Sequence, residues 1–343
     1  MVIFVKFIKI RRFLKSSWDY LFFSKKSINI SQLIFAVCLF QFSYIPVSPA
    51  QQYSNVISKY SAPLQNQQAN QGESLFREML YTVESCVQIS TNIRQQIQFL
   101  GFEQVGAGKY LEVKQNEIRR INMNDLGVLF RLELSLQTKM NQGEEPQTDN
   151  LLVVCDKQYV WKDTLINHHS QCERVEVGIV FDAMKAANLT GMPLEATSLS
   201  GLGGIAGMLR EIQSQYDIIP SVEEIQIQDQ LNTLDTLKIR VMLKKHILER
   251  WIGTDEGKKQ SVPEQIPTWI DIYVRKSNYF PYRIDYFWTK DGSEPKKDRF
   301  CRMEFFNTTL NSGEISFEEF IYRSEIPHKD TTAQYIEKLL NLR

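Results

Sequence analysis

The sequence predicts an α+β protein built mainly from an antiparallel β-sheet with one buried and one solvent-exposed face. Three observations lead to this fold class. Several segments alternate apolar and polar residues, an early segment has helical periodicity, and the strand-like segments outnumber the helical ones without alternating with them. A doubly wound parallel sheet requires that alternation and is therefore not expected.

The first element expected is a helix over about residues 73–96. The preceding residues, 51–72, are polar and rich in Gln and Asn, so they are expected to form a flexible linker. The apolar residues of the helix recur at spacings of about three to four, which places them on one stripe of its surface. They are Leu75, Met79, Leu80, Val83, Val87 and Ile93.

Beyond the helix the apolar period changes to two. The alternation is regular in segments 130–137, 237–244 and 282–286, and it places every second side chain on the same face of a sheet. Turn residues such as Asp291-Gly292 separate such segments. Shorter strands are expected at 97–100, 107–113, 118–123, 151–155, 158–163, 172–177, 269–275, 301–306 and 316–322.

Two helices are expected to interrupt the strands, at 180–189 and 205–216, and a short helix is expected at 331–342. The Gly-rich loop 200–204 comes directly before the second of them. A dinucleotide-binding loop needs a preceding strand and a different glycine spacing, so no nucleotide site is expected here.

Residues 1–50 have the composition of a secretory leader. Seven Lys and Arg residues against one acid precede an apolar stretch, 33–45, and small residues stand at Ser48 and Ala50. The stretch is shorter than the ~20 apolar residues that span a bilayer as a helix. The prediction is a cleaved signal peptide and a secreted, periplasmic or cell-envelope protein. The alternative is an uncleaved leader whose residues 33–46 associate with a membrane.

The leader also changes the charge. The whole chain has 40 basic and 40 acidic residues, and removal of residues 1–50 leaves 33 and 39, a net charge of −6. Nucleic acid is not an expected partner, because its binding depends on Lys and Arg that displace counterions from phosphates. The simplest effect of the negative charge is on solubility.

Four cysteines follow the leader: Cys86, Cys155, Cys172 and Cys301. An even number in an exported chain allows two disulfides with three possible pairings. Cys155 and Cys172 lie in successive strand-like segments and are a candidate pair across a hairpin. Buried free thiols are the alternative. The absence of C-x-x-C argues against a zinc ribbon.

Catalytic patterns are missing from the sequence. It contains neither H-E-x-x-H nor G-x-S-x-G. The adjacent His168 and His169 point in opposite directions on an extended chain, so they are poorly placed to share a metal ion. The chain is therefore not expected to be an enzyme, and no cofactor or metal is expected.

Five short segments, in their order along the chain, have a recognisable pattern. They are GAGKYLE at 106–112, FRLEL at 130–134, VCDKQYVW at 154–161, YFPYRI at 279–284, and MEFFN at 303–307 with Phe320 and Pro327 after it. Together they resemble the LolA-like family, which comprises periplasmic carriers of lipoproteins and related lipid-binding domains. The resemblance covers roughly residues 73–330 of this chain, which is longer than a typical carrier near 178–235 and 252–267.

The resemblance implies a strongly curved antiparallel sheet, an incomplete barrel, with an N-terminal helix and a helical lid. This domain would span residues 73–343 and contain a helical insertion near 178–235. The implied function is non-enzymatic: a lipid acyl chain or a lipoprotein is held in an apolar groove between the sheet and the lid. Family carriers hold the lid shut with a strand arginine, and Arg131 is a candidate for that role by its place in the sequence.

Seven apolar residues from three alternating segments would line the concave face of such a sheet: Leu132, Leu134, Leu136, Ile239, Val241, Ile284 and Tyr286. An apolar cleft binds acyl chains because burial yields ~25 cal/mol per Å² of apolar surface. Alternatively, the same side chains fill the core. The chain would then be a structural or protein-interaction module with a filled groove and an exposed strand edge as its contact.

Glycines before the helix at 205–216 are interpreted through the same resemblance. Gly201, Gly203 and Gly204 would form a flexible hinge at the start of a lid helix, with an ordinary loop as the alternative.

Overall fold

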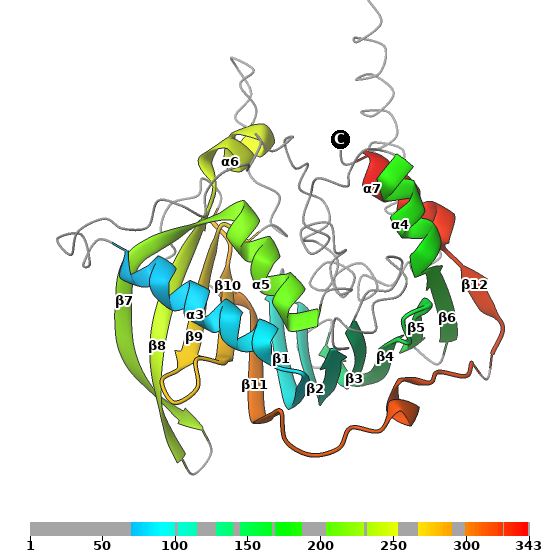
Figure 1. Ribbon diagram of the computed structural model, residues 1–343, viewed down its shortest axis with the longest axis horizontal. Coiled ribbons are helices and arrows are strands. Elements are labelled where there is room, and N and C mark those ends of the chain that lie inside the picture. Colours follow the sequence, from blue (N-terminus) through cyan, green and yellow to red (C-terminus); the bar gives the residue numbers. More distant parts are fainter. Residues whose placement is uncertain are drawn as a thin grey trace, which may run out of the picture. The chain divides into compact units, whose positions relative to one another are not determined.

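A curved sheet of twelve strands and a few short helices make up the part of the chain that the structure, a computed structural model, describes (Figure 1). That part consists of residues 70–99, 102–114, 128–139, 145–166, 169–186, 204–229, 232–252, 267–289, 299–324 and 326–341, all within one compact unit. The leader, most of the linker, the expected strand 118–123, and Gly201 and Gly203 lie outside the described residues.

The strands are β1 Gln88–Phe99, β2 Phe102–Lys114, β3 Val128–Lys139, β4 Gln147–Cys155, β5 Tyr159–Ile166, β6 His169–Glu176, β7 Tyr216–Asp229, β8 Asn232–Leu243, β9 Trp269–Arg275, β10 Pro281–Phe287, β11 Arg299–Leu310 and β12 His328–Asp330. The helices are α3 Gln71–Ser85, α4 Val177–Ala186, α5 Gly204–Gln215, α6 Lys245–Ile252 and α7 Thr332–Asn341, with a 3-10 turn, η5, at Phe317–Phe320. Among these described helices, none is both long enough and apolar enough to cross a bilayer.

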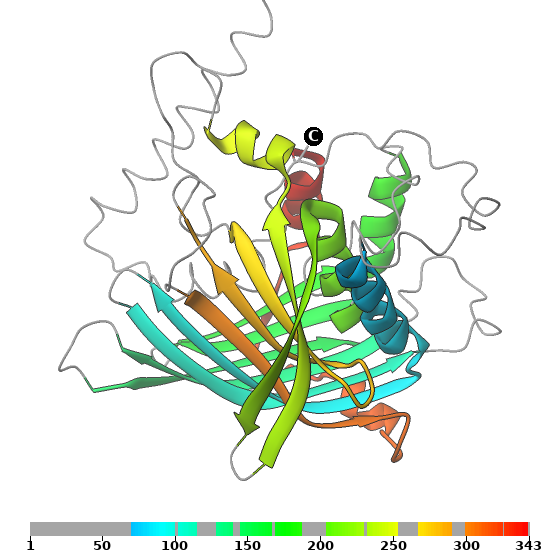
Figure 2. The ribbon, with the colours of Figure 1, turned by 90° about the vertical axis from the view of Figure 1, so that its left-hand side faces the viewer.

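The strands are ordered β12-β6-β5-β4-β3-β2-β1-β11-β10-β9-β8-β7, and the sheet does not close. Each neighbouring pair is antiparallel except β12, which runs parallel to β6. Figure 2 shows the strands curving beneath α3 and α5. The predicted fold class, an α+β protein with a curved, open antiparallel sheet and covering helices, is confirmed.

We call the face of the sheet that carries α3 and α5 the concave face, and the opposite one the outer face. Helix α3 packs against β7, β8 and α5, while α7 packs against α4 and β6 at the other edge. The apolar sides of α3 and α5 are buried: Leu75, Phe76, Met79 and Val83 of α3, and Ile205, Leu209 and Ile212 of α5. Burial of these side chains, worth roughly 1.5–3 kcal/mol each, holds the helices against the sheet.

The outer face of the central strands carries the charged residues that alternate with the apolar ones. Arg240 of β8 binds Asp271 of β9 through two hydrogen bonds, of 2.6 and 2.9 Å. Arg302 of β11 binds Asp285 of β10 in the same way, at 2.7 and 3.0 Å. Such paired bonds fix the register of the strands that they join.

The C-terminal segment crosses the outer face and fastens the far edge of the sheet (Figure 1). Phe320 packs on Leu111, Val113 and Leu129 of β2 and β3. Further along, the Tyr322 hydroxyl donates a hydrogen bond of 2.6 Å to Asp163 on β5. Burial, followed by this hydrogen bond, raises the pKa of Tyr322.

The expected first helix is too long by about ten residues. The observed helix, α3, ends at Ser85, and Cys86 is extended. Residues from Gln88 onward pair with β2 and β11 as strand β1. Two polar residues, Thr91 and Gln95, occupy buried positions of β1. The sequence of β1 therefore lacks a regular alternation of apolar and polar residues. The expected linker also overlaps the start of α3, which begins at Gln71.

Two further expectations fail. The strand expected at 316–322 is instead the turn η5, begun by the Ser316 side chain, which accepts a hydrogen bond from the Glu318 amide. The insertion near 178–235 is not purely helical, because β7 and the start of β8 lie in it. Pro220 lies inside β7, and this is tolerated because β7 is the edge strand and its register shifts between Ile218 and Val222.

The proposed disulfide is also wrong, because Cys86, Cys155, Cys172 and Cys301 are all buried free thiols. Cys155 is on β4 and Cys172 is on β6, with β5 between them. Two strand spacings, about 9–10 Å, exceed the reach of a disulfide. Burial raises the pKa of Cys155 to about 12, which makes its thiol unreactive.

The segment that crosses the outer face offers a matched pair of phenylalanines. Phe320 is 2% exposed and Phe317 is 61% exposed. We predict that Phe320→Ala lowers the free energy of unfolding by about 3 kcal/mol or more, through the lost burial and the cavity. Phe317→Ala should change it by less than about 0.5 kcal/mol. Urea denaturation measures both, and equal losses would contradict the packing described.

Candidate ligand-binding site

The three candidate residues on β3 lie on the concave face. Leu132, Leu134 and Leu136 stand opposite Tyr110, Gly108 and Gly106 of β2, so all six share one face. That face is the one with the helices, because Tyr110 and Glu112 of β2 contact the first residues of α5.

The candidates on β8 and β10 lie on the same face. Ile239 and Ile284 both pair with Ile272 of β9, and Val241 and Tyr286 both pair with Ile270. The Tyr286 hydroxyl reaches the sulfur of Met208 in α5, at 3.9 Å. The structure therefore brings all seven sequence-predicted residues to one face.

Burial divides the seven residues into groups. Ile239, Val241 and Ile284 are completely buried, at 0% exposure, so they belong to the core on which the helices rest. Leu134, Leu136 and Tyr286 are 3–5% exposed, and Leu132 is half-buried. A ligand would reach the β8 and β10 residues only if the helices moved. The part of the concave face formed by β3 lies farther from α3.

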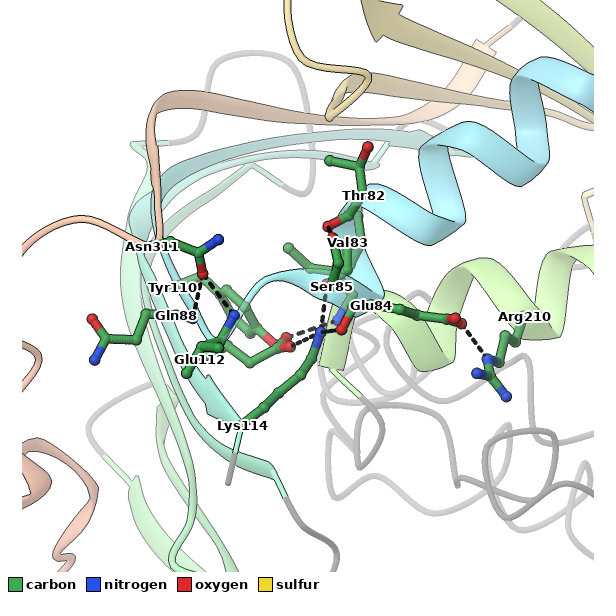
Figure 3. Close-up of polar contacts among 12 residues, drawn as sticks. Thr82, Val83, Glu84, Ser85, Gln88, Tyr110, Glu112, Lys114, Arg210 and Asn311 are labelled. Carbon is green, nitrogen blue, oxygen red and sulfur yellow. Dashed lines mark hydrogen bonds and ion pairs between the residues drawn. The ribbon is translucent and has the colours of Figure 1, made fainter. Parts of the chain in front are cut away.

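A buried carboxylate, Glu112, lies where both helices meet the sheet (Figure 3). One oxygen, Oε2, accepts hydrogen bonds from the Tyr110 hydroxyl at 2.6 Å and from the Ile205 amide of α5 at 3.3 Å. The other, Oε1, pairs with the Lys114 ammonium at 3.4 Å. Burial, followed by the charge of Glu112, raises the pKa of Tyr110 well above its ordinary value, so Tyr110 remains a donor.

Lys114 extends these contacts to α3. Its ammonium donates hydrogen bonds to the carbonyl oxygens of Val83 and of Glu84, the latter at 3.2 Å. These are the free carbonyls of the last turn of α3, where a cation is favoured by the helix dipole. A salt bridge of 2.5 Å between Glu84 and Arg210 then joins α3 to α5 (Figure 3).

Gly204 approaches the same carboxylate very closely. A Cβ atom at this position would lie 2.3 Å from Glu112 Oε2 and 2.7 Å from the Tyr110 hydroxyl, and the φ angle of Gly204 is +64°. Only glycine fits both conditions. Gly204, the described part of the proposed hinge, is thus a close contact between α5 and β2, while the hinge role itself stays a prediction.

A second buried acid, Glu211, lies on α5. Burial raises the pKa of Glu211 to about 8, although a hydrogen bond of 3.1 Å from the Gln215 side chain acts in the opposite direction. Its carboxyl group is therefore mostly protonated at neutral pH. The neighbouring Tyr216 also has a raised pKa, mainly through burial, and donates to the carbonyl oxygen of Pro267 at 2.8 Å.

Arg131 does not have the place that the resemblance implies for a lid arginine. It lies on the outer face, where it pairs with Glu133 and donates a hydrogen bond of 3.0 Å to the carbonyl oxygen of Glu319. Because successive side chains of a strand point to opposite faces, Arg131 points away from the helices that Leu132 faces. It holds the C-terminal segment instead.

Glu112, Lys114 and Gln95 were not predicted as site residues from the sequence. Glu112 and Lys114 alternate with Leu111 and Val113, so the segment has a period of two. The period alone does not determine which of the two pairs faces the helices. Within the described residues there is no group of His, Cys, Asp or Glu side chains that could hold a metal ion.

Comparisons with known proteins give only distant structural likenesses. No protein-family model matches the chain, and no curated protein matches it. Among solved structures, LprF from Mycobacterium bovis has 9% identity and a TM-score of 0.33, covering 71% of this chain and 94% of its own. LppX from Mycobacterium tuberculosis has 8% identity and a TM-score of 0.30, covering 71% and 98%.

A LolA superfamily protein from Nitrosomonas europaea is also similar, with 10% identity and a TM-score of 0.24, covering 74% of this chain and 99% of its own. All three likenesses are distant in identity and in TM-score. They bring no residue roles to this chain.

Breaking the ion pair at the helix junction should destabilise the protein. We predict that Lys114→Met, which leaves the Glu112 carboxylate buried without its cation, lowers the free energy of unfolding by about 3–5 kcal/mol. Adding Glu112→Gln should recover part of this loss.

The control is Lys109→Met, an exposed lysine on the same strand and on the outer face. It should cost less than about 0.5 kcal/mol. Chemical denaturation measures all three variants. A Lys114→Met protein as stable as Lys109→Met would mean that the pair does not fasten the helices.

Proposed function

We propose that this chain is a non-enzymatic lipid- or lipoprotein-binding carrier or sensor of the cell envelope, which holds an acyl chain against the concave face beneath α3 and α5. The observation that carries the proposal is the apolar face itself. Leu134 and Leu136 on β3, Ile284 on β10 and Ile239 on β8 lie on one side of one sheet, beneath two short helices.

The way the helices are fastened supports a cover that can move. The first residues of α5 meet β2 through polar contacts, where Glu112 accepts hydrogen bonds from the Tyr110 hydroxyl and the Ile205 amide. The apolar side of α5 is also buried, and we propose that its first residues separate from β2 when a ligand enters, which leaves the strand ladder intact. An acyl chain that enters there exchanges water for apolar side chains, gaining ~25 cal/mol per Å².

A second candidate function has a specific observation in its favour. Because Ile239, Val241 and Ile284 are completely buried, the β8–β10 end of the face is filled by the chain's own side chains. A face filled along its whole length would make the chain a structural or protein-interaction module. The exposed edge strand β7 would then be its contact surface.

The cellular setting is part of the same proposal. The leader at residues 1–50 would direct the chain to the periplasm or cell envelope, either cleaved or retained as an anchor through residues 33–46. Acyl chains and lipoproteins are met in that compartment, which is why they are the partners proposed.

The test uses adjacent residues on opposite faces of β3. We predict that Leu134→Glu weakens binding of a fluorescent polyene fatty acid by at least about tenfold, because a charge cannot be buried against a hydrocarbon chain. Ser135→Glu, on the exposed outer face, should bind as the wild type does. Fluorescence titration measures binding, and circular dichroism and thermal melting check the fold.

Leu132→Glu covers the case in which Leu134→Glu does not fold. Leu132 is half-buried on the same face, so a charge there is better tolerated by the fold but still meets the ligand. A folded Leu132→Glu or Leu134→Glu protein that binds the fatty acid like the wild type would contradict the proposal. Wild-type protein that binds no fatty acid would favour the interaction module.

A further inference from the structure

One residue on the concave face does not fit an apolar core. Gln95 lies on β1, which has six strands on one side and five on the other, so it stands at the middle of the sheet. Its side chain is 1% exposed. Neither its amide nitrogen Nε2 nor its carbonyl oxygen Oε1 has a hydrogen-bond partner in the described structure.

The register places Gln95 among apolar residues on the concave face. It stands opposite Gly106 of β2 and Met303 of β11, between Ile93 and Ile97 of its own strand. Gly106 has no side chain, and a Cβ there would lie between Leu136 at 2.6 Å and Gln95 at 3.8 Å. Gln95 is therefore next to Leu136, one of the residues proposed to meet the ligand.

A second amide supports the same conclusion. Gln104 of β2, two residues from Gly106, is 2% exposed and on the same face. Its nitrogen donates to the Thr138 hydroxyl at 3.0 Å, but its carbonyl oxygen has no partner among the described residues. Neighbouring strands thus present one free amide donor group and two free carbonyl acceptors to the same apolar face.

Unpartnered buried amides are costly, because each has given up its hydrogen bonds to water. Native proteins keep few of them, and those they keep need an explanation. A methionine at position 95 would fill a similar space without that cost. The free groups of Gln95 and Gln104 are accounted for if a bound molecule supplies their partners.

We propose that Gln95 and Gln104 form a polar subsite that binds the carbonyl end of an acyl chain. This inference rests on the proposed function. Gln95 Nε2 donates to the acyl carbonyl oxygen, and Oε1 of Gln95 or Gln104 accepts from an adjacent N–H or O–H. The ligand class is an acyl chain headed by an amide or a protonated carboxyl group. An ester satisfies only the donor, and a hydrocarbon satisfies neither.

The experiment measures how four compounds with the same chain length displace a bound fluorescent polyene fatty acid from the full-length protein. They are dodecanamide, dodecanoic acid, methyl dodecanoate and dodecane. In the wild type, dodecanamide should bind most tightly and dodecane least. Gln95→Met should weaken dodecanamide binding about tenfold, equivalent to about 1.4 kcal/mol, and leave dodecane binding within about twofold.

The matched control is Gln98→Met, the same substitution on the outer face of the same strand, at an exposed position. It should leave all four affinities unchanged. The melting temperature is a second measurement: Gln95→Met should raise it, because an unpartnered amide is removed from the core, and Gln98→Met should not.

The outcomes separate the two proposals. Weaker dodecanamide binding by Gln95→Met, with dodecane binding retained, supports the subsite. If Gln95→Met binds dodecanamide as tightly as the wild type does, the subsite is overturned while acyl-chain binding stands. If the wild type binds neither the fatty acid nor any of the four compounds, the proposed function fails and the subsite with it.

Discussion

An open sheet with one apolar face has to cover that face, and in this protein a buried ion pair fixes the ends of the helices whose apolar sides cover it. Glu112 and Lys114 of β2 contact the first residues of α5 and the last turn of α3 (Figure 3). A buried carboxylate is stable only if it is paired and hydrogen-bonded, so the helix ends are held where they can supply those bonds. Glu112 contacts the first residues of α5, and this close approach requires glycine at position 204.

The two halves of the concave face therefore have different physical characters. At the β8–β10 end the helices lie on fully buried aliphatic residues and form an ordinary core. Toward β1–β3, the same face combines leucines with polar side chains such as Gln95, whose hydrogen-bonding groups are not used by the described structure. The buried apolar residues explain the stability of the face, whereas the unsatisfied groups of Gln95 are those that we propose a bound acyl chain to partner.

Much of this fold could be predicted from the sequence. Strands β3, β8 and β10 alternate strictly, and their register then places Leu134, Ile239 and Ile284 on one face, as expected. Only the end of strand β1, within the expected strand 97–100, was predicted, because Gln95 is polar at an inward position and breaks the alternation before it. The site residues were missed for the same reason: a pattern of apolar residues cannot single out the polar side chains that are buried among them.

Long-range contacts could not be predicted from the sequence either. Cys155 and Cys172 lie in strands that follow closely in the chain, yet a third strand separates them in the sheet. Arg131 was a candidate lid arginine, but it lies on the outer face and binds the C-terminal segment that crosses this face some 190 residues later. Contacts of that range depend on the topology, which local periodicity does not contain.

The most direct test of the central claim, that the concave face holds an acyl chain, is native mass spectrometry. The protein would be produced from its full-length sequence in the periplasm of a Gram-negative host and purified without detergent. The account predicts a mass above that of the polypeptide, with the excess recovered by organic extraction as an acyl lipid. A folded protein with the mass of the polypeptide alone, which also takes up no added fatty acid, would contradict it.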